Sequence, residues 1–316
     1  MGTCLQHAYQ ACAGYGQILP SVTSPLHPTS FEGWFFTAYA GALAVLVALP
    51  WAIRRLAKFR DPLPLLMLGS GLITSLGEPQ LDFVSHLRWA NNLPGPAFTA
   101  YGLHVPALIP PCYMLFMGLE AYWLFCTLQR GITVKQFAWV AFFIGLSDAI
   151  MENPGLLMHT YQYYGNQPFK FGDFVYYYAF TNSAAICTIA VMAYFLWPRV
   201  RGKGWLTLAI LPLGIIGTTI GEFGTGFPTW LAINSQMATW LQWVVGSLTL
   251  ILACVWIRVL AELTATAKEP TFSLWALFKE RLHIGGRART PSPITGQPGI
   301  AHTAITPDAG KMSITS

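Results

Sequence analysis

Six acidic residues lie within stretches of sequence that are otherwise apolar enough to cross a lipid bilayer, and no Lys or Arg accompanies them at that depth: Glu78, Asp82, Glu120, Asp148, Glu152 and Glu222. Placing one charge at membrane depth costs on the order of several kcal/mol, so an intramembrane acid is a candidate functional residue by default. Carboxyl groups crowded together away from water cannot all ionise, because desolvation and mutual repulsion keep some of them protonated. A protonated acid beside an ionised one supplies a general acid and a general base in one pocket.

Two groups of these acids have helical spacing, each within a single apolar segment: Glu78, Asp82 and His86 in the first, and Asp148, Glu152 and His159 in the second. Residues at such intervals project from about one face of a helix. Pro79 and Pro154 stand beside the acids and predict a break near each one, since proline removes a backbone hydrogen bond. Irregular backbone is tolerated at membrane depth where it borders a polar cavity. The pattern therefore predicts a shared polar site.

Within that site, the sequence favours Glu152 as the proton donor and Asp148 as the proton acceptor. The predicted catalytic residues are Asp148, Glu152, Glu78, Asp82 and His86, and the predicted substrate-binding residues are Asn182, Glu222, His159, Trp240 and Tyr177. Glu120 is expected to have a structural role. Aromatic side chains, which are dense toward the outer ends of the segments, have two interpretations. They stabilise a passing carbocation, or they form the belt that Trp and Tyr make at a membrane interface.

The composition assigns the chain to the membrane class. It has 316 residues, of which 54% are hydrophobic and 10% are charged, whereas soluble domains carry about 25% charged residues. The scarcity of charge also argues against nucleic acid as a partner. Seven segments have the length of a membrane span: 33–53, 62–87, 106–128, 134–158, 174–197, 204–224 and 236–261. The prediction is an all-α, seven-transmembrane-helix bundle.

The basic residues predict its orientation. Sixteen of the eighteen Lys and Arg follow the first, third, fifth or seventh segment, which leaves Arg88 and Lys170 on the opposite side. By the positive-inside rule the N-terminus is outside and the C-terminus is cytoplasmic, with the cell membrane as the expected location. The predicted domains are an outer tail at 1–32, a membrane domain at 33–265, an interfacial amphipathic segment at 266–285 and a disordered tail at 286–316.

A weak internal repeat links the three segments that run outward. Gly71–Glu78 and Gly145–Glu152 have the same spacing, and Gly214–Glu222 matches them with one extra residue. Repetition of an ancestral hairpin and chance similarity of Gly-rich segments both account for this pattern.

One stretch resembles a run found in bacterial multi-pass membrane proteins of unassigned function: Glu152–Leu156 followed by Tyr163–Pro168. This resemblance covers about a tenth of the chain and implies no activity. The acids in an apolar helical bundle are also similar, by analogy, to integral-membrane terpene cyclases and sterol isomerases, which use buried carboxylates for proton transfer to isoprenoid carbon. No motif of those families aligns with this chain, so none of their site residues is carried over.

Taken together, the residues predict an integral-membrane enzyme that applies general acid–base chemistry to an apolar isoprenoid or lipid, by cyclisation, isomerisation or hydration. Its expected partners are membrane lipid and the apolar substrate, with no cofactor. Two alternatives remain open. A metal-dependent membrane enzyme would use the carboxylates and His to bind a divalent ion, and a proton-coupled transporter would use the acids as a relay.

Overall fold

The computed structural model describes residues 27–266, all of which belong to the unit Met1–Thr271. This part of the chain is mostly helical, and within it six helices are long and apolar enough to cross a membrane. They are Phe31–Phe59, Ile109–Gln129, Val134–Leu157, Tyr177–Val200, Gly204–Ile233 and Thr239–Thr264. The predicted all-α, multi-pass membrane class is confirmed at this level.

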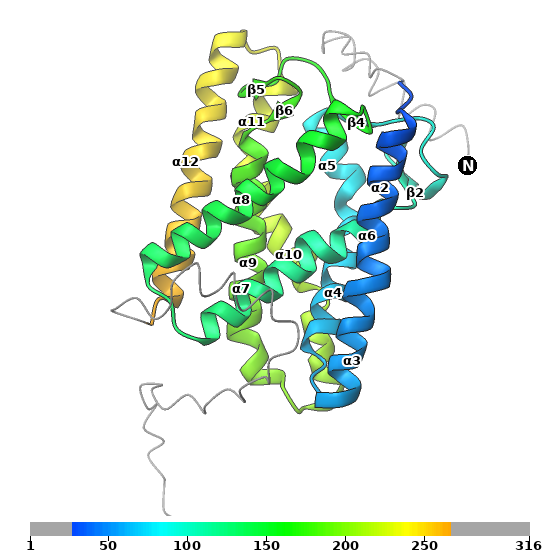
Figure 1. Ribbon diagram of the computed structural model, residues 1–316. Helices are drawn as coiled ribbons and strands as arrows, with labels where there is room; N and C mark the ends of the chain where they lie inside the picture. Colours follow the sequence, from blue (N-terminus) through cyan, green and yellow to red (C-terminus); the bar gives the residue numbers. More distant parts are fainter. Residues whose placement is uncertain (1–26, 267–316) are drawn as a thin grey trace, which may run out of the picture. The chain divides into compact units, whose positions relative to one another are not determined.

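Several of these long helices are composed of shorter elements in direct succession (Figure 1). The α-helices are α2 Phe31–Leu43, α3 Leu49–Phe59, α4 Leu63–Thr74, α5 Glu78–Ser85, α6 Ile109–Tyr113, α7 Glu120–Gln129, α8 Val134–Leu157, α9 Tyr177–Val200, α10 Leu213–Thr218, α11 Gly224–Ile233 and α12 Thr239–Thr264. The π-helical turns are η1 Ala44–Ala48, η3 Met114–Leu119 and η5 Thr219–Phe223, and the 3-10 turns are η2 Ser75–Gly77 and η4 Gly204–Ile210.

The second predicted span, 62–87, forms the continuous helical run α4–η2–α5 but differs in composition from the six helices above. Its outer third carries Glu78, Gln80 and Asp82, which lower its apolar character. Pro79 occupies the first turn of α5, directly after the 3-10 turn η2. The predicted break beside Glu78 is therefore present. At Pro154 no such break occurs, because α8 continues past the proline to Leu157.

Three predicted boundaries were wrong. The sixth segment was expected to end at 224, where glycines and Pro228 follow, but α11 continues it to Ile233 with Pro228 inside the helix. The predicted segments 106–128 and 174–197 were expected to be helical from their first residues. Short strands lie at these starts instead: β3 Leu103–Pro106 and β6 Phe174–Val175.

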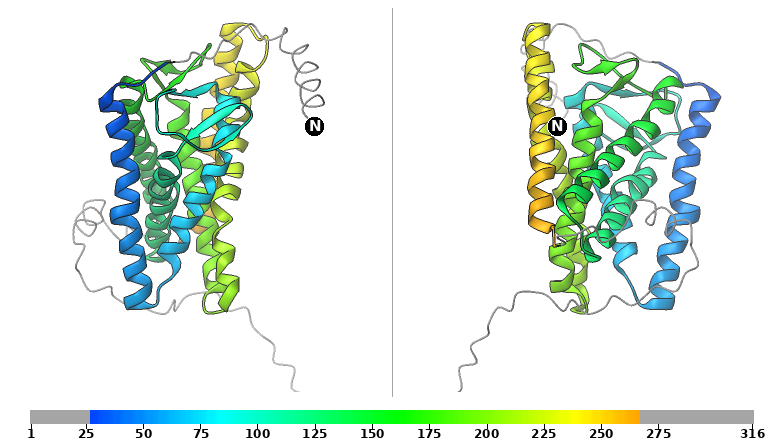
Figure 2. Two further views of the ribbon diagram at one scale, coloured as in Figure 1. Left: turned by 90° about the vertical axis from the view of Figure 1, so that its right-hand side faces the viewer. Right: turned by 60° about the vertical axis from the view of Figure 1, so that its left-hand side comes forward.

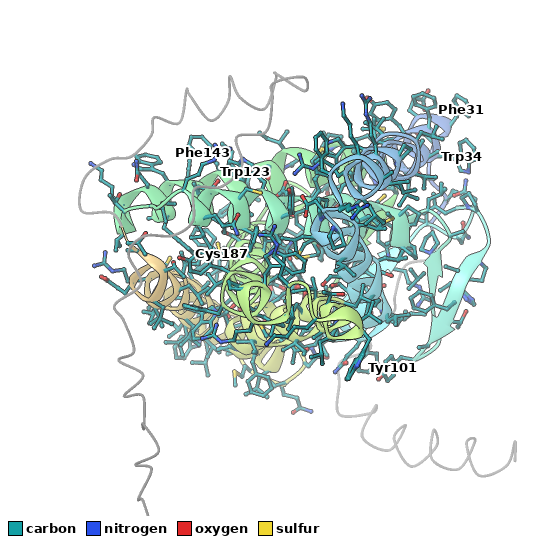
Figure 3. The ribbon with its side chains drawn as sticks, turned by 90° about the horizontal axis from the view of Figure 1, so that it is seen from below. Phe31, Trp34, Tyr101, Trp123, Phe143 and Cys187 are labelled. Carbon is teal, nitrogen blue, oxygen red and sulfur yellow. The ribbon has the colours of Figure 1, made fainter. Side chains whose placement is uncertain are left out.

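Helix α9 is the central element of the bundle. It packs against α7, α8, α10, α11, α12 and η5, and its Cys187 lies in the middle of the helices in the end-on view (Figure 3), where it is fully buried. Phe31, Trp34 and Phe143 lie at the perimeter of the same view and are exposed. Large apolar side chains facing outward from a helical bundle indicate a lipid-facing surface. Helices α2–α3 and α12 lie on opposite sides of the bundle (Figure 2).

Glycine positions the helices that carry the acids. A Cβ on Gly71 would collide with the backbone of Tyr113 and Gly118, and one on Gly145 would lie 2.6 Å from the Ala179 carbonyl oxygen. Small residues let helix backbones approach this closely in membranes. Because Glu78 and Glu152 each follow such a glycine by seven residues, or about two helical turns, they share its inward face. The repeat noted in the sequence thus has a packing function.

The extra residue in the third copy of the repeat coincides with a π-helical turn. Gly214, whose missing Cβ makes room for the Ser70 carbonyl, precedes Glu222 by eight residues, and η5 begins between them and includes Glu222. A π-turn contains more residues than an α-turn, so it absorbs one inserted residue. It returns Glu222 to the inward face that Gly214 occupies.

Short strands close one end of the bundle. Strand β1 (Leu87–Trp89) pairs antiparallel with β4 (Tyr161–Tyr163), so that Trp89 lies opposite Tyr161 and Leu87 opposite Tyr163. Strands β2 (Pro96–Ala100) and β3 form a hairpin, and β5 (Lys170–Phe171) pairs with β6. The β1–β4 pair joins the chain after α5 to the chain after α8. Of the predicted domains, the interfacial segment, the C-terminal tail and nearly all of the outer tail lie outside the described residues.

Candidate active site

Five of the six predicted intramembrane acids face the interior near the strand-covered end of the bundle. Asp82 and Asp148 are 1% exposed, Glu78 is 5% exposed and Glu222 is fully buried, while Glu152 is half-buried. Helices α5, α8 and the π-turn η5 supply them. Each of them has a different set of hydrogen-bond donors, and these donors determine what each acid can do.

Glu152 accepts hydrogen bonds from two tyrosines of β4. The hydroxyls of Tyr161 and Tyr163 donate to the same carboxylate oxygen, Oε2, at 3.0 and 3.2 Å. Alternate residues of a strand point to one face, which explains why both rings reach α8 while Gln162 does not. Burial, followed by the negative charge of Glu152, raises the pKa of both hydroxyls well above 10. They therefore stay neutral donors, and two such donors stabilise the ionised form of Glu152.

Asp82 accepts a hydrogen bond from a residue of β1. The Trp89 indole Nε1 donates to Asp82 Oδ2 at 3.1 Å, and the ring packs against Tyr161 with centroids 4.8 Å apart. The negative charges of Asp148 and Glu78 contribute, after burial and Glu152, to raising the pKa of Tyr161. One tyrosine thus lies close to acids from both predicted groups, on α5 and on α8, as the sequence predicted for a shared site.

Glu78 lies at the edge of a small hollow. The Tyr113 hydroxyl donates a hydrogen bond to Glu78 Oε2. Both residues line a cavity of about 90 Å³ together with Gln80, Thr218, Thr219 and Phe223. Gln80 and Thr219 are exposed on the outer surface, so the hollow opens between α5 and η5 on a side where lipid is expected.

Asp148 is hydrogen-bonded to Asn182. The side-chain amide nitrogen of Asn182, on α9, lies 3.1 Å from both oxygens of Asp148. The sequence-based expectation that Asn182 orients one of the acids stays a prediction; Asn182 reaches Asp148 from the α9 side, and both groups are buried. The arrangement favours a positioning role for Asp148 over direct contact with a substrate.

His86 ends α5 in a left-handed conformation, with φ of +56°. Its Nε2 lies 3.0 Å from Asn234 Oδ1, and its ring stacks on Tyr164 at 5.2 Å. These contacts connect α5 to α11 and to the chain after β4. The ring is buried, and Asn234 and the Tyr164 ring, which it contacts, are both uncharged, which is consistent with a structural role.

Three other predicted residues lie away from the acids or have other partners. His159 is exposed beyond the end of α8 and pairs with Gln162 at 3.1 Å, so its expected alignment with Glu152 was wrong. Trp240, at the start of α12, is 69% exposed, as an interfacial residue would be. Tyr177 is buried and donates to Gln167 Oε1 at 3.2 Å. Glu120 accepts a hydrogen bond from Ser147 at 3.0 Å, which fits its predicted structural role.

Positive charge is scarce around the site. The ion pairs found between residues 27 and 266 are Arg55–Asp61 and Arg258–Glu262, both remote from the acids. Arg88 on β1 interacts electrostatically with Asp82 without forming a bridge. Within the same residues, no group of three or more His, Cys, Asp or Glu side chains is arranged to hold a metal ion.

The sequence did not identify the donors that surround the acids. The pattern assigned no role to Tyr113. It assigned Trp89, Tyr161 and Tyr163 only to the group of outer aromatic residues, which either stabilise a carbocation or form an interfacial belt. The alternation Tyr161-Gln162-Tyr163, directly after a helix end, is a strand signal. It would have placed both hydroxyls on one face, but not opposite Glu152.

Comparison of the chain with protein-family models, curated proteins and solved structures gives no significant match. The function is therefore argued from the geometry of the acids.

Proposed function

We propose that this protein is an integral-membrane enzyme that uses buried carboxyl groups for general acid–base chemistry on an apolar isoprenoid or lipid. The observation that carries the proposal is the Glu78–Tyr113 pair, which lies in a hollow that opens between α5 and η5. A carboxyl group at a lipid-facing opening meets substrates that dissolve in the bilayer. Cyclisation, isomerisation and hydration are the reactions that such a group can promote.

The number of donors around each acid suggests the division of labour. Glu152, with two tyrosine donors, is the best-stabilised carboxylate and acts as the base that accepts a proton. Glu78, which accepts a hydrogen bond from Tyr113 and lies in the hollow, is the acid that protonates the substrate. Asp82 and Asp148, held by Trp89 and Asn182, supply negative charge that stabilises a cationic transition state.

The size of the hollow limits the substrate. Sites that enclose a small molecule have volumes of about 300–1,000 Å³, whereas this hollow has about 90 Å³. It admits the reactive end of a long molecule while the remainder stays in the bilayer. A chain that carries its alkene, epoxide or carbonyl group near one end fits this restriction.

We also propose that α4–η2–α5 is a seventh crossing, with the N-terminus outside and the C-terminus in the cytoplasm of a cell membrane. The run Leu63–Ser85 is helical throughout. It joins the turn after α3 to the strand-covered end of the bundle (Figure 1). The loops that carry most of the Lys and Arg then fall on one side.

The test is deuterium transfer to carbon. The purified protein in lipid nanodiscs is incubated in D₂O with long-chain isoprenoids and lipid extracts, and products are analysed by mass spectrometry. We expect product that carries deuterium at carbon, with the rate reduced by about 10²–10⁴-fold in Glu78→Gln and in Glu152→Gln. Glu262→Gln, at the surface of α12, is the matched control and should retain the wild-type rate.

Absence of any converted product, with or without deuterium, from every lipid class would reject the enzyme. If a pH gradient across proteoliposomes then drove uptake of a solute, and Glu78→Gln abolished that uptake, the transporter alternative would replace it.

A further inference from the structure

Glu222 is the one acid of the group to which the division of labour above gives no task. Its side chain is fully buried, and neither carboxyl oxygen has a hydrogen-bond partner among residues 27–266. It lies in the π-turn η5. π-turns inside α-helices occur frequently at functional sites.

Further buried polar atoms lie near Glu222 or near Tyr178, which interacts with Glu222 electrostatically. The Tyr178 hydroxyl, the Trp230 indole Nε1 and the Thr218 hydroxyl are all buried, and none makes a hydrogen bond of normal geometry within the described part of the chain. Thr218 lies one helical turn before Glu222 and also lines the hollow beside Glu78. Buried polar groups without protein partners are usually satisfied by ordered water.

The charged and titratable groups that interact electrostatically with Glu222 come from several elements. They are Glu78 on α5, Asp148 and Glu152 on α8, Tyr113 on α6, and Tyr177 and Tyr178 on α9. None of these groups carries positive charge. An ionised Glu222 would therefore be a buried anion beside other acids, without a hydrogen bond or a cation from the described residues to offset it.

We propose that Glu222 is a protonated acid that returns the proton from Glu152 to Glu78 after each reaction, through water held by Thr218, Tyr178 and Trp230. This inference rests on the proposed function. It makes Glu222 a relay residue, which does not contact the substrate.

The proton balance of the cycle closes without any co-reactant. Glu78 gives a proton to substrate carbon or oxygen and becomes a carboxylate, while Glu152 takes a proton from the resulting cation and becomes a carboxylic acid. Glu222 then gives its proton to Glu78 and receives the one held by Glu152. At the end, Glu78 and Glu222 are again protonated and Glu152 is again ionised.

Infrared spectroscopy in nanodiscs tests the resting state without any substrate. A protonated carboxyl group has a C=O stretching band separate from that of a carboxylate, and this band shifts in D₂O. We expect Glu222→Gln to remove one component of this band, Glu222→Asp to shift that component and Glu262→Gln to leave it unchanged. A band that is identical in the wild type and in folded Glu222→Gln would overturn the proposal.

A bound cation in place of the proton is the other outcome that would overturn it. In that case Na⁺, K⁺ or Ca²⁺ would raise the thermal unfolding temperature of the wild type but not of Glu222→Gln. The proposal predicts no such difference.

Turnover separates this inference from the proposed function. If Glu222 is a relay, Glu222→Gln retains the first turnover, whereas its steady-state rate falls by about 10²-fold, the lower end of the effect of losing a proton-transfer group. An equal loss of the first turnover and of the steady-state rate would reject the relay and leave the assignment of Glu78 and Glu152 intact. Failure of the wild type to convert any lipid would instead reject the proposed function.

Discussion

Hydrogen-bond donors, at the scale of single residues, distinguish acids that the sequence presents as equivalent. Glu152 has two tyrosine donors, Asp82 has a tryptophan and Asp148 has an amide. Glu222 has no partner within the described residues. A carboxylate is stabilised in proportion to the donors it receives, so one cluster can hold a base and protonated acids at the same pH.

Asn182 is predicted to matter for stability. Asn182→Leu leaves Asp148 buried without its amide partner, so the free energy of unfolding should fall by about 1–3 kcal/mol. Thermal unfolding in detergent measures this loss. The double variant Asn182→Leu with Asp148→Leu removes both polar groups and should recover most of it. A single variant as stable as the wild type would show that Asp148 does not depend on Asn182.

Tyr161 is predicted to make the protein sensitive to alkali. Burial and the charge of Glu152 raise its pKa above the ordinary value of 10.0. In the unfolded chain the same hydroxyl ionises near that ordinary value. The stability it contributes is therefore fully present below pH ~10 and is lost as the pH rises further, by up to about 1.4 kcal/mol per pH unit.

The measurement is the unfolding free energy between pH 9 and 12, a range set about the ordinary tyrosine value. Tyr161→Phe should lose stability less steeply above pH ~10 than the wild type, because it has no hydroxyl to ionise in the unfolded state. Tyr101→Phe, in the exposed β2–β3 hairpin, is the control for the substitution. Equal slopes in Tyr161→Phe and the wild type would contradict the prediction.

At the scale of elements, three glycine-to-glutamate units carry acids into the site. Gly71 and Gly145 each allow close contact with a neighbouring helix, and the Glu that follows shares their face. In the third unit the π-turn η5 compensates for one additional residue before Glu222. A rotation of about 100°, which one uncompensated residue would cause, would turn that acid toward lipid.

Deletion of Ile220 tests this account of η5. Ile220 is 42% exposed and lies in the π-turn, so its removal should convert the turn to an α-helix and keep Glu222 on the inward face. We expect the variant to fold, with an unfolding temperature within a few degrees of the wild type, a change of about 1 kcal/mol.

The matched control deletes Phe227, an exposed residue of α11 that lies beyond the π-turn. There no π-turn absorbs the change, so the packing of Trp230 and Thr229 is lost and the unfolding temperature should fall much further. Similar effects of the two deletions would show that η5 is not a compensating insertion.

At the scale of the whole molecule, charge and helix order together define the proposed orientation. The ends of α3 and α9, which together with the turns that follow them carry many Lys and Arg, lie at one end of the bundle, and the paired strands lie at the other (Figure 1). Lys170, one of the two basic residues on the strand side, donates to the Tyr163 carbonyl oxygen at 2.8 Å.

Reporter fusions test this orientation. A cytoplasm-dependent fluorescent reporter fused after the last residue should be active, whereas a phosphatase that requires an oxidising exterior should be active when it is inserted in the β2–β3 turn. The reverse pattern would exclude the proposed topology. A further reporter in the turn after α3 that reports the same side as the β2–β3 turn would exclude a crossing by α4–η2–α5.

The sequence by itself determined the membrane class, the positions of most helices and the identity of the acids that gather in the interior. It could do so because bilayer length and helical periodicity are local properties of a chain. It also determined which residues of α5 and α8 share a face, apart from His159, which lies beyond the end of its helix.

Only the tertiary structure decided which donor meets which acid. Trp89 and Tyr161 reach Asp82 and Glu152 because β1 pairs with β4 across more than seventy residues of sequence. The hollow beside Glu78 depends likewise on the approach of α6 and η5 to α5. Such contacts follow from how helices pack against one another. The pattern within one helix does not contain them, because it specifies a face and not the partner that covers it.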